Sequence, residues 1–470
     1  MALPGISITI NPNGLRQLAA SGANVCCKLG ISSLGTVNTL YSFADPATVV
    51  STLGAGPLVE AILDTLAVAG GTVLAVPLAH STAGTVGAST HTGTGTGTVT
   101  GSSSASAYDA YQVVVTIVTA GTLGTALFTW SVDGGNTTSG QVLVPLSTGV
   151  YVIPGTLVTL TFAGTFVVGD TYAFSTTPAA FATGDVTAAL AVLLADPTDW
   201  GFVHVIGQAS TAAGAAALAA IVDAQMVAAA AAFRYVFGIV ECPTLDSGGA
   251  LIADATISGA FTSFVSERTM VCVGDIGHIS SFNGWTLRRN CSTAVASRLS
   301  QIPAREHPGK VVRGPLKGVK SLYRNETATP YLDAQRFTTL RSFVKKQGFF
   351  ITRGEMMAVN GSDYANVMNR RVMDIACSYA YGSLLNVLNS DVAVDKGTGF
   401  IYPPEAASVE RAVRGDILRG LNGNARDATV QVSKTEPILS TKRFPVDIGI
   451  LPFGYAEQIV TTIGFINPAL

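Results

Sequence analysis

Few residues in this 470-residue sequence have the type and spacing that acid–base or metal chemistry requires. Asp275 and His278 follow the apolar run Val271–Val273, and the end of a buried strand is where α/β enzymes often hold catalytic groups. Glu306 and His307 are adjacent, but their neighbours favour a solvated loop. The five histidines are isolated, without HExxH or paired Cys/His spacing. The pattern therefore predicts neither a metal site nor a complete acid–base site.

Phosphate-binding loops are also incomplete. The segment that begins at Gly54 resembles GxGxxG but lacks the third glycine, and Pro57 removes an N–H that would bind a phosphate. The Gly-Thr repeat from Thr92 to Thr98 has no lysine and is predicted to be a flexible linker. GxxxxGK[ST] and GxSxG are absent. No cofactor is expected.

Basic residues offer a third kind of chemistry, the binding of nucleic acid. Doublets occur at 288–289, 345–346 and 370–371, and a looser cluster runs from Lys310 to Arg324. Phosphate binding would place such charges on one face, with aromatic residues interleaved for single strands. Solvated faces and intersubunit ion pairs account for the doublets more simply. No direct contact with nucleic acid is expected.

The composition indicates a folded chain whose surface is covered by other subunits. Apolar residues make up 48% of the sequence, charged residues 12% against a usual ~25%, and the mean hydropathy is +0.42. Such a chain is not disordered. A free monomer would struggle to cover its surface with polar groups, and burial of that surface between subunits resolves the difficulty.

The net charge of −2 conceals a division along the chain. Residues 1–267 carry three basic and fourteen acidic side chains, and residues 268–470 carry twenty-five basic and sixteen acidic ones. A basic nucleic-acid or membrane module is one reading. Identical copies that stack an acidic half on a basic half are another, and chance segregation is a third.

Signals for export, membrane insertion and disulfide bonding are weak or missing. The start at Met1 has no basic region followed by an apolar run, so a signal peptide is not indicated. Ala212–Phe233 is apolar but mostly alanine, which favours a buried helix over a membrane span. The six cysteines are scattered without a CxxC pair, as in a cytosol-made protein with reduced thiols.

The elements that would position these residues fall into three regions. Strands and helices alternate over 20–83 and again over 183–300, which predicts one discontinuous α/β core domain. The intervening residues 84–182 hold short strand-like runs separated by turn residues and predict an inserted all-β module. Residues 301–455 form a basic α+β domain, with helices predicted over 332–343, 367–388 and 405–421.

The third region resembles the C-terminal domain of contractile-tail sheath proteins, which occur in phages and related contractile injection machines. The residues that carry the resemblance run from Tyr323 to the end of the chain. They are Tyr323–Glu326, Leu332-Asp333, Arg336-Phe337, Gly348–Gly354, Met356–Ala358, Gly361–Asp363, Asn369–Asp374, Ser440–Lys442, Gly454–Ala456 and Ile463–Leu470. Pro4-Gly5, Phe43–Asp45 and Gly54–Pro57 fit as well, whereas the β insertion has no match.

The resemblance implies an α+β multidomain structural protein: an α/β core with an outward-facing β insertion, and a C-terminal sheath domain with exchanged terminal strands. Sheath subunits form stacked hexameric rings around a tail tube and contract from a metastable extended state. The N-terminal extension (1–19) and C-terminal arm (456–470) would each complete a sheet in a neighbouring subunit. The candidate exchanged residues are Ile6, Ile8, Ile10, Ile459, Ile463 and Phe465.

The resemblance also implies partners and a location. The partners are further copies of the chain, a tail tube protein, and baseplate and tail terminator proteins, with no membrane insertion. The location is the virion tail, after synthesis and assembly in the cytoplasm of a bacterial host. Arg411, Arg414 and Arg419, on one predicted helix, are candidates to face the tube. No enzymatic activity is expected.

Two other functions stay open from the sequence alone. A surface-layer or capsid-decorating protein fits the low charge, the many Gly and Thr residues and the β insertion, but not the C-terminal resemblance. A cytosolic α/β enzyme with a β insertion would need titratable groups that converge on the strand ends. Asp275 and His278 are the only hint of such a group.

Overall fold

Strands from both sides of the predicted insertion build one central sheet. The computed structural model describes residues 22–103, 106–207 and 210–465, and the strand order in this sheet is β15-β14-β13-β1-β3-β2. The strands are β1 Cys26–Gly30, β2 Tyr41–Phe43, β3 Val73–Pro77, β13 Phe202–Val205, β14 Phe237–Cys242 and β15 Thr269–Val273. Because β1 pairs in parallel with both β3 and β13, the segments that flank residues 84–182 are neighbours in space.

Helices cover both faces of this sheet, which explains why its strands are mostly apolar. One face packs against α3 Thr183–Ala195, α4 Ala212–Ala231 and α5 Asp254–Ala260. The other packs against α1 Pro46–Leu53, α2 Pro57–Ala69 and α6 Ser292–Gln301. Adjacent Cys26 and Cys27 point to opposite faces, as the period of a strand requires, and both are buried.

Helix α4 is the alanine-rich segment for which a buried helix was predicted. By length and composition it is the one helix among the described residues that could cross a membrane. Its buried residues recur at helical spacing and pack on the central sheet, and they are Ala212, Ala215, Leu218, Ala219, Val222, Met226 and Ala229. The prediction of a core helix here is confirmed.

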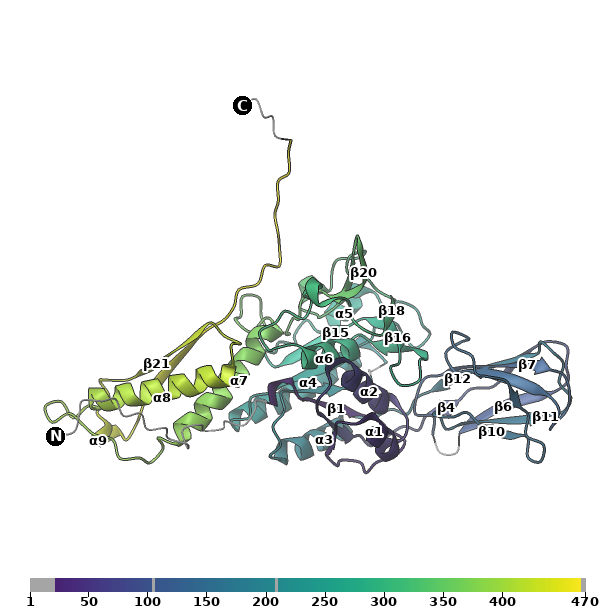
Figure 1. The fold of residues 1–470 in the computed structure, drawn as a ribbon, viewed down its shortest axis with the longest axis horizontal. Helices are drawn as coiled ribbons and strands as arrows, with labels where there is room; N and C mark the ends of the chain where they lie inside the picture. Colours follow the sequence, from purple (N-terminus) through teal and green to yellow (C-terminus); the bar gives the residue numbers. More distant parts are fainter. Residues whose placement is uncertain (1–21, 104–105, 208–209, 466–470) are drawn as a thin grey trace, which may run out of the picture.

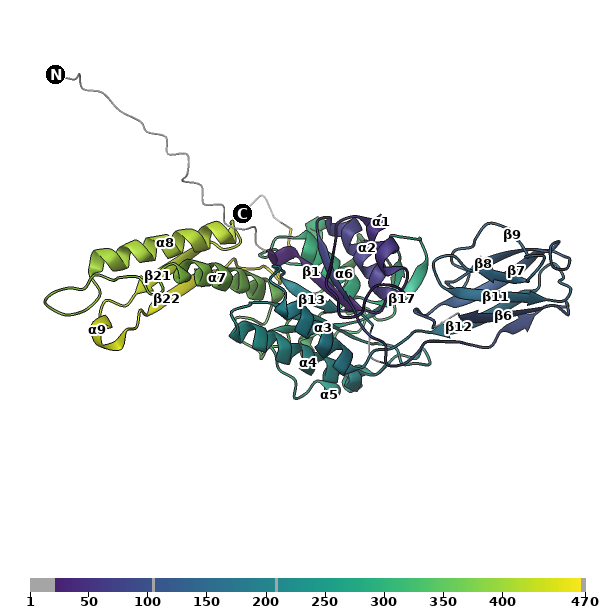
Figure 2. The ribbon, with the colours of Figure 1, turned by 90° about the horizontal axis from the view of Figure 1, so that it is seen from below.

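Strands β4 to β12, which fall within the predicted insertion 84–182, form a two-sheet β-sandwich, here called the β-domain, at one end of the elongated molecule (Figures 1 and 2). One sheet has the order β10-β11-β6, and the other β4-β12-β7-β8-β9, with β5 also paired to β12. The strands are β4 Thr85–Val86, β5 Thr90–Thr92, β6 Thr98–Ser103, β7 Gln112–Thr119, β8 Leu127–Ser131, β9 Val142–Leu143, β10 Val150–Val152, β11 Val158–Ala163 and β12 Thr171–Thr177.

The prediction that Thr92 to Thr98 is a flexible linker is wrong. The ends of this repeat belong to β5 and β6, and the turn between them is bound by a buried carboxylate. Asp170 Oδ1 accepts hydrogen bonds from the amides of Thr94 and Gly95 at 3.0 and 3.1 Å. A partner distant in sequence therefore orders a stretch whose composition is typical of linkers.

A three-stranded antiparallel sheet and a two-stranded hairpin lie beside the central sheet. β16 Asp275–Ile279 pairs with β17 Thr286–Asn290 and with β18 Val319–Leu322, and β19 Leu340–Phe343 pairs with β20 Lys346–Ile351. The core cluster beneath them includes residues on both sides of position 300, such as Leu299 and Leu316. The boundary between the core domain and the C-terminal domain, placed at residue 300 from the sequence, stays a prediction.

The helix predicted over 332–343 is not formed. A short 3-10 turn, Asp333–Gln335, ends at Arg336 with a positive φ of 72°, and the chain then continues into β19. Thr338 pairs with the edge of the central sheet, donating to Val271 O and accepting from Val273 N, each at 3.0 Å. Backbone pairing with the core therefore outweighs the helix-like spacing of the apolar residues.

Two long helices project from the core at the end opposite the β-domain (Figure 1). α7 Val367–Leu385 and α8 Pro403–Leu421 pack together and against the two-stranded sheet of β21 Asp427–Val432 and β22 Val446–Leu451, with α9 Ile438–Thr441 between the strands in sequence. The two helices confirm the predictions for 367–388 and 405–421. The described residues beyond β22, 452–465, carry no helix or strand.

Candidate functional site

Asp275 and His278, the candidate acid–base residues, have separate partners. Asp275 is fully buried, and its Oδ2 accepts from the amides of Thr244 and Leu245 at 2.8 and 2.9 Å. His278 Nε2 lies 2.6 Å from Asp64 Oδ2. Burial lowers the pKa of His278, but the bond to Asp64 outweighs burial and the net shift is upward. Both groups fix elements of the fold to one another.

A four-residue buried network lies at the central sheet, where the sequence alone did not indicate one. Lys28 Nζ is 3.2 Å from His204 Nδ1, and His204 Nε2 is 2.9 Å from Ser292 Oγ, which donates to Glu241 Oε1 at 2.8 Å. Lys28, His204 and Ser292 are 0% exposed. Burial, aided by the charge of Lys28, lowers the pKa of His204 to about 4, so His204 is neutral at physiological pH. Side chains this deep hold the sheet and α6 together.

Two of the three basic doublets are likewise internal. Arg288 and Arg289 pair with buried carboxylates, and Arg370 and Arg371 are buried at the start of α7. The third doublet, Lys345 and Lys346, lies at the turn of the exposed β19–β20 hairpin. The doublets therefore do not form one face.

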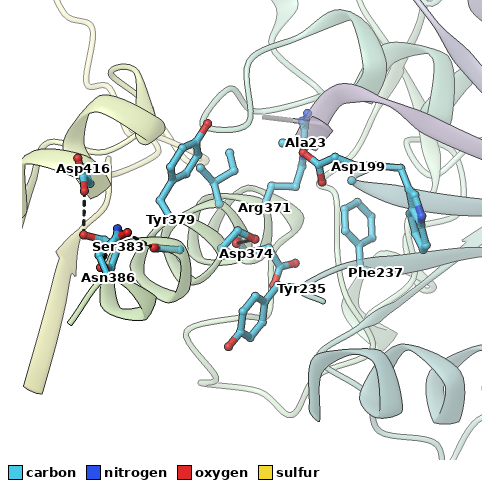
Figure 3. Close-up of a pocket in the computed structure, with 15 residues that line it drawn as sticks. Ala23, Asp199, Tyr235, Phe237, Arg371, Asp374, Tyr379, Ser383, Asn386 and Asp416 are labelled. Carbon is cyan, nitrogen blue, oxygen red and sulfur yellow. Dashed lines mark hydrogen bonds between the residues drawn. The ribbon is translucent and has the colours of Figure 1, made fainter. Parts of the chain in front are cut away.

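A cavity of about 370 Å³ lies between α7 and the start of β13 and β14 (Figure 3). Aromatic side chains, among them Phe237, line it, with Asp199 at one side and Asp416 at the other. Ser383 donates a hydrogen bond to Asp416 at 2.8 Å. Among the described residues that line the cavity there is no histidine, cysteine or lysine.

The C-terminal arm is held at its root. Tyr455 Oη donates to Arg305 O at 2.7 Å, and the Arg305 guanidinium lies 4.8 Å from the centre of the Phe453 ring. The next residues approach a carboxylate-rich site, where Arg353 Nε is 3.5 Å from Glu457 Oε2 and 3.3 Å from Asp333 Oδ2. These contacts fix the point at which the arm leaves the body.

Beyond Glu457 the side chains of the arm that the structure describes are exposed to solvent. Ile459, Ile463 and Phe465, three of the candidate exchanged residues, are 81%, 93% and 109% exposed. The arm runs away from the body of the molecule as an extended segment (Figure 1). Ile6, Ile8 and Ile10 lie outside the described residues. The structure thus presents a row of apolar side chains that the described residues of the chain leave uncovered.

The three candidate tube-facing arginines lie exposed on α8. Arg414 already has partners within the chain: its Nη2 is 2.7 Å from Asp427 Oδ1, and its Nε donates to Ala428 O at 2.7 Å. Arg419 Nη1 is 3.5 Å from Asp416 Oδ1. Among the described residues Arg411 has no ion-pair partner, which makes it the most available of the three for another molecule.

Comparison with known structures shows which fold this geometry has. The fold is that of contractile sheath proteins. A chain of the anti-feeding prophage baseplate in its contracted state is similar with a TM-score of 0.56 at 12% identity, over 99% of this chain and 98% of that chain. A chain of the contracted PVC sheath complex, from an extracellular contractile injection system, gives 0.53 at 10% identity, again over 99% and 98%.

A crystal structure extends the likeness. The sheath tail protein of Desulfitobacterium hafniense gives a TM-score of 0.50 at 12% identity, over 95% of this chain and 100% of that chain. By sequence, this chain belongs to the DUF2586 family, since residues 3–355 match the model described as the DUF2586 N-terminal domain. No protein of curated function matches the sequence.

Proposed function

We propose that this chain is the structural subunit of a contractile tail sheath. It polymerises as stacked hexameric rings around a tail tube, and it contracts from a metastable extended state to drive the tube through a target envelope. The observation that carries the proposal is the sheath fold, shared over 99% of the chain. The low charge content of 12% supports it, because a lattice buries surface that a monomer would expose.

The terminal strands link the subunits. The acceptor in this proposal is the two-stranded sheet β21–β22, in which each strand has one paired edge and one edge unpaired by the described residues. An unpaired edge offers backbone N–H and C=O groups to an extended segment from another chain. The exposed arm that carries Ile459, Ile463 and Phe465 has the extended, apolar character of such a segment.

Contraction needs no bound nucleotide in this mechanism. A shorter packing that buries more apolar surface is favoured by roughly 25 cal/mol for each Å² removed from water. Summed over a lattice, that difference drives the transition once a baseplate releases it. Linked strands keep the subunits connected while their bodies rotate. ATP hydrolysis coupled to contraction would contradict the mechanism.

The partners follow from the geometry of a sheath: copies of the same chain, a tail tube protein, a baseplate and a tail terminator. The acidic first half and basic second half of the chain give neighbouring copies complementary surfaces. The site of function is the tail of a virion or of a related injection particle, assembled in the cytoplasm of a bacterial host.

The test is negative-stain electron microscopy of the purified, tag-free chain over a concentration series at two salt strengths. Hollow ribbed tubes are expected, and deletion of residues 1–13 should abolish them while leaving the thermal unfolding of the monomer unchanged. Flat arrays would favour a surface-layer protein instead. Discrete monomers at every concentration, also when the neighbouring tube gene is co-expressed, would overturn the proposal.

A further inference from the structure

The β-domain carries almost no charge. Residues 84–182 contain no lysine, arginine or glutamate, although the chain has 28 lysines and arginines in all. Their only acidic side chains are Asp109, Asp133 and Asp170, which are 4%, 5% and 1% exposed, and His91 is their one histidine. The outer surface of this domain is therefore formally neutral.

Each of the three aspartates has an internal structural task. Asp109 pairs with Arg289, Asp133 accepts from Thr286 N at 2.9 Å, and Asp170 orders the turn between β5 and β6. These contacts account for the acidic groups, so no charge is left on this domain to recognise a charged partner. An anionic envelope or nucleic acid would select lysine and arginine, and neither is present.

One side of the sandwich is apolar. β10 is at the edge of one sheet and β9 at the edge of the other, and they lie on the same side because Tyr151 of β10 contacts Phe128 and Trp130 of β8, the neighbour of β9. The exposed aliphatic side chains of β9, of β10, of the loop that joins them and of the turn after β10 are Leu143 (52%), Leu146 (74%), Val150 (40%), Val152 (52%) and Leu157 (36%). Exposed edge strands are usually guarded by charged side chains, and this edge has none.

The opposite edge of the same sheet has a different, compatible surface. β6 is the other terminal strand of the order β10-β11-β6, and it exposes Thr98, Thr100 and Ser102. Threonine is β-branched and packs well beside valine on neighbouring strands. β10 and β6 both run antiparallel to β11, so copies related by a rotation would bring β10 of one beside β6 of the next in a parallel pairing.

We propose that the β9–β10 edge of the β-domain docks against the β6 edge of the β-domain in a second copy of this chain. Identical neutral surfaces meet without charge repulsion, and unpaired edges supply backbone hydrogen bonds to each other. In the proposed sheath this would give the subunits an outer belt of contacts, separate from the terminal strands and from the charge-complementary bodies. The contact would be insensitive to ionic strength, unlike contacts between charged surfaces.

The test uses two single substitutions of the full chain, Val152→Cys on β10 and Thr100→Cys on β6, and a flexible bis-maleimide. Five of the six native cysteines are buried and Cys377 is partly buried, so the unsubstituted chain is the background control. Cross-linked dimers are expected in a mixture of the two variants, in 50 mM and in 500 mM salt alike. Cross-linking is read on pelleted polymer and on unassembled chain at the same high concentration, so the result does not depend on tubes forming.

A second measurement asks whether the apolar edge carries the contact. One chain carries Leu146→Lys, Val152→Lys and the cysteine substitution Val150→Cys, and it is mixed with the Thr100→Cys chain. Its cross-link yield should be about tenfold lower than that of a Val150→Cys chain without the lysines, because the lysines would be buried without a counter-charge. Ala173→Lys, exposed on a central strand, is the matched control and should leave the yield unchanged.

The outcomes separate this proposal from the sheath proposal. Dimers in the mixture, but not from either variant alone, support the docking. Dimers formed by Val152→Cys alone would place two β10 edges together with two-fold geometry and would overturn the pairing of β10 with β6. The absence of dimers from both preparations would overturn it, even if tubes form. Binding of the chain to isolated cell envelopes that is lost in Leu146→Lys, without any cross-link, would assign the edge to a foreign partner and would also overturn it.

Discussion

Arg289 and Asp109 form a two-pronged ion pair across 180 positions of sequence. Nη1 of Arg289 donates to Oδ1 of Asp109 at 3.0 Å and Nη2 donates to Oδ2 at 2.6 Å, while Glu60 of α2 takes a further bond from the same guanidinium. Asp109 lies in the β-domain and Arg289 in β17. Trp285, just before β17, adds edge contacts to Tyr111 and Trp130. The β-domain is therefore fixed to the core at its base.

This pair predicts a large effect of a single substitution. Arg289→Met leaves Asp109 and Glu60 as two buried carboxylates without a counter-charge, which should cost about 3–5 kcal/mol of unfolding free energy. Arg289→Lys keeps the charge but not the fork and should cost less. Chemical denaturation at pH 7 measures both. Equal stability of Arg289→Met and the unsubstituted chain would show that the pair does not hold the domain.

The buried His204 predicts a loss of stability in mild acid. Its pKa is depressed to about 4 in the folded chain, against about 6.5 when unfolded. Between these values the unfolded chain binds the extra proton, so stability is full above pH 6.5 and falls as the pH drops toward 4, by on the order of 3 kcal/mol. Denaturation midpoints over this range should therefore decline, and His204→Gln should flatten the decline. A His204→Gln chain with an unchanged slope would contradict this.

The arm predicts a face-specific effect on assembly. Ile459, Ile463 and Phe465 are separated by even numbers of residues, so they share one face of an extended strand. Ile463→Asp and Phe465→Asp should abolish polymers, because a charge would enter the acceptor sheet, while the thermal midpoint of the monomer should not move for side chains 93% and 109% exposed. Thr462→Asp, on the opposite face, is the control. Sedimentation and microscopy read the result, and equal loss in the control would contradict the strand model.

The available arginine of α8 predicts a change in tube binding alone. Arg411→Glu should weaken co-assembly with the tail tube protein without altering self-assembly, because Arg411 has no ion-pair partner within the described chain. Arg414→Glu is a poorer probe, since it also breaks the pair with Asp427. Co-pelleting with the tube protein at two salt concentrations is the measurement. Undiminished co-pelleting of Arg411→Glu would remove this residue from the tube-facing set.

The sequence indicated the elements that rest on local periodicity. The strands of the central sheet are mostly apolar runs, and α4, α7 and α8 repeat apolar residues at helical spacing, so their positions follow from composition and turn residues. The segment near residue 340 has helix-like spacing, yet Thr338 pairs with Val271 and Val273 of the core. No local pattern contains that information.

Contacts between residues distant in sequence could not be predicted either, because no local pattern contains them. Lys28 and His204 lie 176 positions apart, and Arg289 and Glu60 lie 229 apart, so only the folded topology brings them together. Asp170 in turn orders a glycine-threonine stretch 75 positions earlier. In each case a buried polar group finds its partner through packing.

The β-domain starts and ends at one place in the core. Thr82 and Ala180 form an antiparallel bridge, and β4 pairs with the end of β12, so the chain departs and returns side by side. Because the two ends of the β-domain are adjacent, the whole domain could be replaced by a short turn or by another domain without changing the strand order of the central sheet. The exchange has one condition. An excision that removes Asp109 leaves Arg289 half neutralised in the core, so a successful graft must bring its own acid or replace the arginine.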